Sequence, residues 1–212
     1  YCYQCEEVPM DNSEVKNFKL KFDIKNKDLL VWNNEIIMSR TEEDYFKKMF
    51  IILEKLNLCT DSILEIGFGL GISGSLIQKH LIPTKHHIVE IEANIFKDLL
   101  AFTQENSGVV ATLGDWRLID LPEKEYDFIF NDAYDYGGIS EYANFSYDDH
   151  YLIFSKILKD DGVICHPHFG DGPVRDVKGF KTTIVERLKV NPIVMWDQSI
   201  CEDAAIVLRR KD

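Results

Sequence analysis

The sequence has no apolar run long enough to span a bilayer, and basic residues are in the minority. No basic segment followed by an apolar one stands at the start of the given sequence, and we expect a cytoplasmic protein with no membrane partner. Lys and Arg total 24 against 36 Asp and Glu, which gives a formal net charge of -12. Nucleic-acid-binding proteins usually rely on a basic surface. The charge balance therefore argues against a nucleic-acid partner and favours a small or cationic one.

Cysteine is also scarce, with five in the whole chain. Cys2 and Cys5 have the spacing of half a zinc site, but no second Cys or His pair completes it. We therefore expect no metal and reduced thiols, as in a cytosolic protein.

What is present suits a folded chain built around one core. The 212 residues are 45% hydrophobic and 28% charged, which is ordinary globular usage. Residues 1–40 contain short strand-like stretches, Phe18–Phe22 and Leu29–Trp32, and we interpret them as an N-terminal arm or lid. Residues 41–212 form the main domain.

The main domain alternates between strand and helix patterns. Thr41–Asp44 fits a capping box before a helix with apolar residues at helical spacing. The predicted strands that follow are Ser62–Ile66, His87–Ile91, Val109–Leu113, Tyr126–Asn131 and Val163–His166. Helices are expected from the glycine-rich turn to about Leu81, over Ala93–Glu105 and over Tyr147–Lys159, with Gly162 as a left-handed C-cap.

The end of the chain completes the predicted sheet. A helix is expected over Phe180–Leu188, and Ile193–Trp196 and Ala204–Arg209 are close enough to pair as a hairpin. The whole pattern predicts an α/β fold with a doubly wound, Rossmann-like sheet of seven strands. The sheet should be mostly parallel, with a C-terminal antiparallel hairpin.

The sharpest motif is the glycine-rich segment Ile63–Gly74, where a strand must turn tightly into a helix. Glycine permits the unusual backbone angles and lets a ligand approach the backbone. Gly69, Gly71 and Gly74 also spell the GxGxxG dinucleotide fingerprint, and Glu90 lies where a ribose-binding acid is expected.

Three features favour S-adenosylmethionine over a nicotinamide cofactor at this turn. Glu65 precedes the glycines, and an acid suits the amino and sulfonium groups of S-adenosylmethionine but would repel a pyrophosphate. A helix precedes the first strand of the main domain, and the sequence pattern predicts an antiparallel hairpin at the end of the sheet.

These motifs resemble those of class I methyltransferases, and more closely those of guanidinoacetate N-methyltransferase and related arginine N-methyltransferases. The resemblance covers about residues 38–165. The similar segments are Leu64–Ile72, Pro83–Glu90, Gly114–Trp116, Tyr126–Tyr134 and, upstream, Arg40–Tyr45.

The resemblance implies a set of cofactor-binding residues. Glu90 would accept hydrogen bonds from both ribose hydroxyls, Asp115 would accept from the adenine amine, and Trp116 would stack on the ring. Two alternatives stay open. Trp116 could instead be a core residue, and Phe68 could pack either on the cofactor or under the next strand. The remaining contacts are expected from Glu65, Gly67, Gly69 and Gly71.

The resemblance also implies the catalytic pair Asp132 and Glu42. A guanidinium keeps its proton throughout the ordinary pH range, so its nitrogens are poor nucleophiles. Carboxylates could grip the cation through paired N–H bonds and accept its proton. For Glu42 the alternative is a helix-start acid that complements the helix dipole. The expected acceptor-binding residues are Tyr45, Tyr134, His166 and His168.

Two departures from the family concern the acceptor. Thr41 stands where the family has Trp, and Cys165–Gly172 differs from the family's polar loop for the substrate carboxylate. We expect N-methylation of a small guanidino or amino compound. Methylation of an arginine or another nitrogen in a peptide or protein, and an inactive cofactor-binding subunit, stay open, as does a homodimer.

Overall fold

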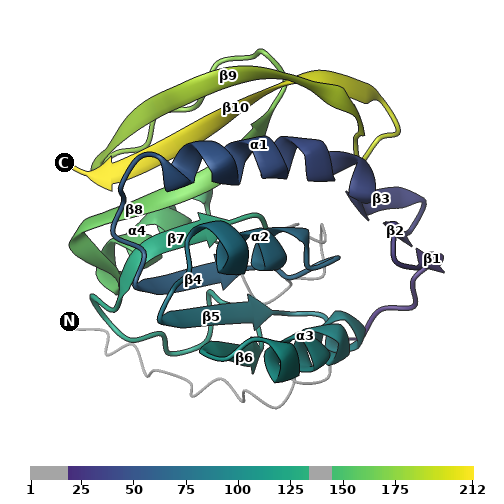
Figure 1. Cartoon of the computed structure of the whole chain (residues 1–212), viewed down its shortest axis with the longest axis horizontal. Coiled ribbons are helices and arrows are strands. Elements are labelled where there is room, and N and C mark those ends of the chain that lie inside the picture. The colour runs from purple at the N-terminus through teal and green to yellow at the C-terminus, as the bar shows by residue number, and fades with distance from the viewer. Residues whose placement is uncertain (1–18, 134–144) are drawn as a thin grey trace, which may run out of the picture.

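The structure is a computed structural model, and it describes residues 19–133 and 145–212. Its centre is a seven-stranded sheet in the order β6-β5-β4-β7-β8-β10-β9 (Figure 1). The neighbours from β6 to β8 are parallel, whereas β10 is antiparallel to both β8 and β9. The predicted fold class is confirmed. The strands are β4 (Ser62–Ile66), β5 (Lys85–Glu90), β6 (Val109–Leu113), β7 (Tyr126–Asn131), β8 (Leu158–Phe169), β9 (Phe180–Val194) and β10 (Ile200–Lys211).

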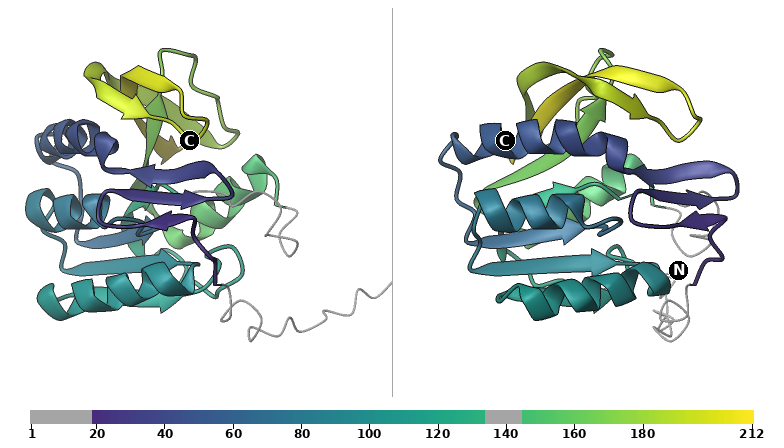
Figure 2. Two further views of the ribbon diagram at one scale, coloured as in Figure 1. Left: turned by 90° about the vertical axis from the view of Figure 1, so that its right-hand side faces the viewer. Right: turned by 45° about the vertical axis from the view of Figure 1, so that its right-hand side comes forward.

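Helices cover both faces of this sheet (Figure 2). One face carries α1 (Glu43–Glu54), α2 (Ile72–His80) and α3 (Ala93–Glu105), and the other carries α4 (Tyr147–Ile157). The sheet therefore has a hydrophobic cluster on each side, as expected for a doubly wound fold. None of the helices in the described ranges is long and apolar enough to cross a membrane.

Helix α1 is held to the sheet by one apolar face. Its buried residues recur every three or four positions, which places them on a single side of the helix. Two of them, Phe46 and Phe50, pack on Phe130 of β7, with ring centroids 6.1 and 5.3 Å apart. Figure 1 shows β9 and β10 above α1, and buried residues of both strands belong to the same hydrophobic cluster as the buried face of α1. The start of α1 is thereby fixed near the carboxyl end of β7.

A smaller sheet stands across the carboxyl edge of the large one (Figure 2). It consists of β1 (Ile24–Lys25), β2 (Leu29–Trp32) and β3 (Glu35–Ser39), all antiparallel. Asn33 and Asn34 both have positive φ, 53° and 62°, as a tight two-residue hairpin turn requires. The backbone N–H of Ile36 donates to the carbonyl of Trp196 at 3.2 Å, which ties β3 to the end of β9.

The structure corrects one element and several boundaries predicted from the sequence. The expected helix over Phe180–Leu188 is part of β9, because Thr182, Thr183 and Ile184 are β-branched and pair with β10. The fifth strand is longer than predicted. It begins at Leu158, so α4 ends at Ile157 and Gly162 lies inside β8 without a left-handed conformation.

The predicted helix cap is also two residues too late. Ser39 caps a short 3₁₀ turn, η2 (Arg40–Glu42), that leads into α1. Its side chain accepts from the backbone N–H of Thr41, and Glu42 accepts from the backbone N–H of Ser39 at 3.1 Å. Ser39 therefore takes the place that the sequence pattern assigned to Thr41.

Candidate active site

A cavity of about 300 Å³ opens where the strands of the large sheet end and the small sheet stands across them. Its size falls at the lower end of the range for small-molecule sites. The carboxyl ends of parallel strands are where ligands bind in doubly wound folds. Its walls come from both sheets, η2 and the loops between them: residues 36–38, 42, 66–69, 73, 89–91, 95, 114–117, 131–133, 150, 169 and 193–196.

The glycine turn after β4 forms one wall. Gly67 and Gly69 line the cavity with φ of 86° and 53°, a left-handed region that side chains disfavour. A Cβ on Gly69 would overlap Met38 Sδ, near the end of a side chain that can shift, and a Cβ on Gly67 would lie 3.3 Å from the Asp132 carbonyl oxygen. Both positions therefore favour glycine mainly because of their backbone conformation. Gly71, also predicted as a cofactor contact, is the N-cap of α2 and does not line the cavity.

Glu90 lies at the end of β5 and lines the cavity beside the glycine turn. Its carboxylate accepts from the backbone N–H groups of Phe68 at 2.9 Å and Glu92 at 2.8 Å. Burial raises the pKa of Glu90, and the backbone N–H groups work in the opposite direction. The side chain thus holds the glycine turn in place as well as facing the cavity, a structural role that the sequence did not indicate.

Asp115 and Trp116 follow β6 and line the same end of the cavity. Both oxygens of Asp115 already accept from Arg117, at 2.8 and 2.6 Å. Trp116 stacks on Phe154 of α4, with centroids 4.7 Å apart and rings nearly parallel. The two readings of Trp116 are therefore compatible, since the indole belongs to the core and also reaches the cavity wall.

Glu42 and Asp132 line the cavity from different elements, η2 and the end of β7. Both side chains are half-buried. Burial raises the pKa of Glu42 to about 7, although the hydrogen bond from Ser39 lowers it. Burial also raises the pKa of Asp132 well above its usual range, and the charges of Glu42 and Glu65 add to this effect. The structure therefore brings together the two acids that the sequence selected as a catalytic pair.

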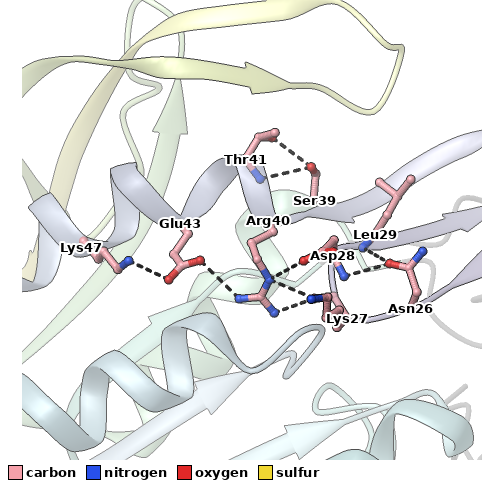
Figure 3. A network of polar contacts seen from close by, with 9 residues as sticks. All are labelled: Asn26, Lys27, Asp28, Leu29, Ser39, Arg40, Thr41, Glu43 and Lys47. Carbon is pink, nitrogen blue, oxygen red and sulfur yellow. Dashed lines mark hydrogen bonds and ion pairs between the residues drawn. The ribbon is translucent and has the colours of Figure 1, made fainter.

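A polar network fixes the segment that carries Glu42 (Figure 3). The Arg40 guanidinium donates to the carbonyl of Lys27 at 2.6 Å and to the Asp28 carboxylate at 3.1 Å. It also reaches Glu43 at 3.3 Å, and Glu43 pairs with Lys47 one turn along α1. The turn between β1 and β2 is thus tied to the start of α1, on either side of Glu42.

Glu65 does not line the cavity, although the sequence suggested a contact with the cofactor. Its side chain is fully buried beneath the glycine turn, where Ser73 of α2 donates to one oxygen. The ring of His86 on β5 lies 2.9 Å from the other oxygen. Glu65 shares a face of β4 with Ile63, and that face is covered by α2. The side chain therefore points under the helix and not into the cavity beyond the end of the strand.

The three expected acceptor-binding residues that the structure describes, Tyr45, His166 and His168, do not line the cavity. Tyr45 is buried, and its hydroxyl donates to the carbonyl of Ala205 and accepts from the backbone N–H of His168 at 3.2 Å. His166 accepts from the buried Arg209 at 3.2 Å, and burial lowers the pKa of His166 to about 4. Tyr134 lies outside the described residues.

The cavity also contains residues that the sequence did not indicate. Met38 and Trp196 come from segments far apart in the chain, and no local pattern marks either of them. Phe169 could have been found: strand alternation places it opposite His168, on the α1 face with Cys165. Asn131, at the end of β7, has a side-chain oxygen that is buried without a hydrogen-bond partner among the described residues.

No group of three His, Cys, Asp or Glu side chains in the described ranges is arranged to hold a metal ion. Cys2 and Cys5 lie outside those ranges. Of the others, Cys59 is exposed, Cys165 is buried and Cys201 is intermediate.

Solved structures with the same fold include several methyltransferases. The YcgJ protein from Bacillus subtilis has 12% identity and a TM-score of 0.57, with 78% of this chain and 99% of that chain covered. A SAM-dependent methyltransferase from Aquifex aeolicus has 11% identity and a TM-score of 0.55, with 81% and 94% covered. TYW2 from M. jannaschii in complex with AdoMet has 13% identity and a TM-score of 0.52, with 89% and 90% covered.

No curated protein matches the chain at a significant level. The profile of the family described as guanidinoacetate N-methyltransferase matches residues 10–169, which include every element from β1 to β8 and all of the cavity except its β9 wall. The chain therefore belongs to the guanidinoacetate N-methyltransferase family and is a class I S-adenosylmethionine-dependent methyltransferase.

Proposed function

We propose that this enzyme methylates a nitrogen of a small cationic compound, a guanidine or an amine. The observation that carries the proposal is the pair Glu42 and Asp132 in one cavity wall, each with a raised pKa. Ionisation of two acids in a half-buried site is unfavourable, because each carboxylate loses water and the two negative charges repel each other. A bound cation would offset that cost, so the site favours a positively charged acceptor over a neutral or anionic one.

For the cofactor, we propose that the end of the cavity at β4, β5 and β6 holds S-adenosylmethionine. Gly67 and Gly69 line the cavity there, so a ligand could approach their backbone. Each oxygen of Glu90 accepts a backbone N–H and could accept a further hydrogen bond from a ribose hydroxyl. Trp116 would pack against the adenine. Asp115 would accept from the adenine amine only with an oxygen shared with Arg117.

The cofactor supplies an electrophilic methyl group on a sulfonium. Asp132 and Glu42 would bind the N–H groups of the acceptor and localise its charge on the nitrogens that face them. As the new N–C bond forms and the S–C bond breaks, one N–H proton must leave, and a carboxylate of this pair would take it. The protonated carboxyl then returns its proton to water.

The direct test is methyl transfer from labelled S-adenosylmethionine to guanidines, amines, and peptides with and without arginine. Transfer to a small guanidine or amine supports the proposal. Labelling of peptides alone would favour the protein-directed alternative. Binding of S-adenosylhomocysteine without transfer to any acceptor would favour an inactive cofactor-binding subunit. Calorimetry with S-adenosylhomocysteine and NAD tests the cofactor independently, because the proposal requires binding of the first and not of the second.

A further inference from the structure

The wall of the cavity that faces away from β5 and β6 is apolar. It is built by Ile36 and Met38 of β3, Phe169 at the end of β8, and Ile193, Met195 and Trp196 at the end of β9. Glu42 lies in η2, which directly follows β3, and Asp132 follows β7, the strand next to β8, so both acids come from segments adjoining this wall. An acceptor held by these two acids would therefore extend its substituent over hydrocarbon and aromatic surface.

The described residues offer that substituent no cation. Arg117 is the one Lys or Arg side chain among those that line the cavity, and it sits at the Trp116 end, bound to Asp115. His150, the one lining histidine, also belongs to that end, with its ring 5.1 Å from Trp116. In the sequence, residues 134–144, which follow Ala133 of the wall, contain Asp135 and Glu141 but no Lys, Arg or His. Residues 1–18 contain one basic residue, a lysine.

A carboxylate on the acceptor would consequently be costly in this site. It would enter beside two acids and leave water without a positive partner to replace it. An apolar substituent has the opposite effect, because each buried methylene adds about fourfold to affinity. The ring of Trp196, 55% exposed at the mouth, offers a surface on which such a substituent could pack.

We propose that the acceptor is a cation with an apolar substituent and no carboxylate. This inference rests on the proposed function, since it specifies the acceptor of the same site. It separates this chain from an enzyme that uses guanidinoacetate, whose carboxylate would face Glu42, Asp132 and the apolar wall.

Two guanidines of the same shape provide the test. Isobutylguanidine differs from guanidinoacetate in that an isopropyl group replaces the carboxylate. Both are titrated by calorimetry into the protein saturated with S-adenosylhomocysteine, and both are then assayed for methyl transfer. We expect isobutylguanidine to bind about tenfold more tightly or better, and to be the better acceptor.

A variant with an added positive charge at the cavity provides a second test. Trp196→Arg places a guanidinium at the mouth of the cavity, at a position exposed enough to accept it. We expect this variant to bind guanidinoacetate more tightly than the parent and isobutylguanidine less tightly. Ile82→Arg adds the same charge between α2 and β5, away from the cavity, and should change neither affinity.

The failures can be told apart. If guanidinoacetate binds as tightly as isobutylguanidine, or more tightly, the inference is overturned while the proposed function stands. If isobutylguanidine binds more tightly but neither compound is methylated, the inferred preference is supported and the proposed transfer to a guanidine fails. If neither compound binds, the inference is overturned and the proposed function is restricted to amines, which the labelled-transfer panel tests.

Discussion

The charge of Glu42 on η2 raises the pKa of Asp132 at the end of β7, so two acids separated by 90 positions in the chain titrate as neighbours. Burial is the larger cause for each residue. The pair is maintained because the β1–β2 turn and α1 are both fixed around Glu42. Any account of catalysis in this cavity must treat the two carboxyls together, since the charge of one changes the proton affinity of the other.

Asp132→Asn should separate catalysis from cofactor binding. The variant keeps the volume of the side chain but removes the charge that would hold a cationic acceptor and take its proton. We expect turnover to fall by about 10²–10⁴-fold, with the Kd for S-adenosylhomocysteine nearly unchanged. Single-turnover kinetics and calorimetry measure the two effects. Near-normal turnover would show that Asp132 is not the base, and loss of cofactor binding would make it a cofactor ligand.

The pKa of Glu42 predicts opposite effects of pH on activity and stability. The folded protein holds a proton on Glu42 up to about pH 7, whereas the carboxyl in an unfolded chain loses it near its ordinary value of 4.5. The folded state therefore binds more protons between these values, and the free energy of unfolding should fall as pH rises from 4.5 to 7. Turnover should rise through pH 7, because the ionised form is required.

Glu42→Gln is the matched variant for this pH dependence. Glutamine can still accept the hydrogen bond from the Ser39 backbone, so the cap of η2 is preserved. Urea denaturation between pH 5 and pH 8 should show a flatter stability profile for the variant than for the parent. Identical profiles would mean that Glu42 titrates normally in the folded protein.

Glu90→Ala should weaken cofactor binding and also lower stability. A hydrogen bond to a charged group contributes about 1.5–3 kcal/mol, so losing the ribose contacts should cost a few kcal/mol of cofactor affinity. The N–H groups of Phe68 and Glu92 lose their acceptor as well, which should lower the free energy of unfolding by about 1–3 kcal/mol. Glu123→Ala, at an exposed position before β7, is the control. Normal cofactor affinity in Glu90→Ala would contradict the assignment.

Gly69→Ala tests the contact between the glycine turn and the small sheet. The left-handed backbone costs alanine about 1–2 kcal/mol, and the new methyl would overlap Met38 Sδ. We expect a lower free energy of unfolding and weaker cofactor binding. In a double-mutant cycle with Met38→Ala, the combined loss should be smaller than the sum of the single losses. Additive losses would show that the overlap is relieved by other movements.

The parallel part of the sheet could be predicted because its signals are local. The predicted bounds of β4, β6, β7 and α3 agree with the structure, since each is a short apolar or periodic run between turn residues. The segment Phe180–Leu188 could not be assigned correctly in the same way. Its conformation is decided by pairing with β10, which lies about twenty residues further along the chain.

The site was predictable where a residue is placed by the end of a strand. Glu90 ends a buried strand and Asp132 follows one, so both had to lie at the ligand-binding edge. Glu65 lies inside a strand, and a strand has two faces that a single sequence does not distinguish. Met38 and Trp196 reach the cavity only because β3 is hydrogen-bonded to the end of β9, a contact between segments without a shared sequence pattern.

Met38 also has a thermodynamic consequence. Its sulfur contacts the glycine turn, where Leu70 donates its backbone N–H at 3.1 Å, and its chain continues within four residues to Glu42. A cofactor that moves the glycine turn would therefore also move the segment that carries Glu42, which is proposed to bind the acceptor. Binding of the cofactor and binding of the acceptor become linked in this way. Linkage is reciprocal, so the factor by which S-adenosylhomocysteine changes acceptor affinity must equal the factor by which acceptor changes S-adenosylhomocysteine affinity. Independent binding, in which each ligand has the same affinity with and without the other, is what this arrangement disfavours.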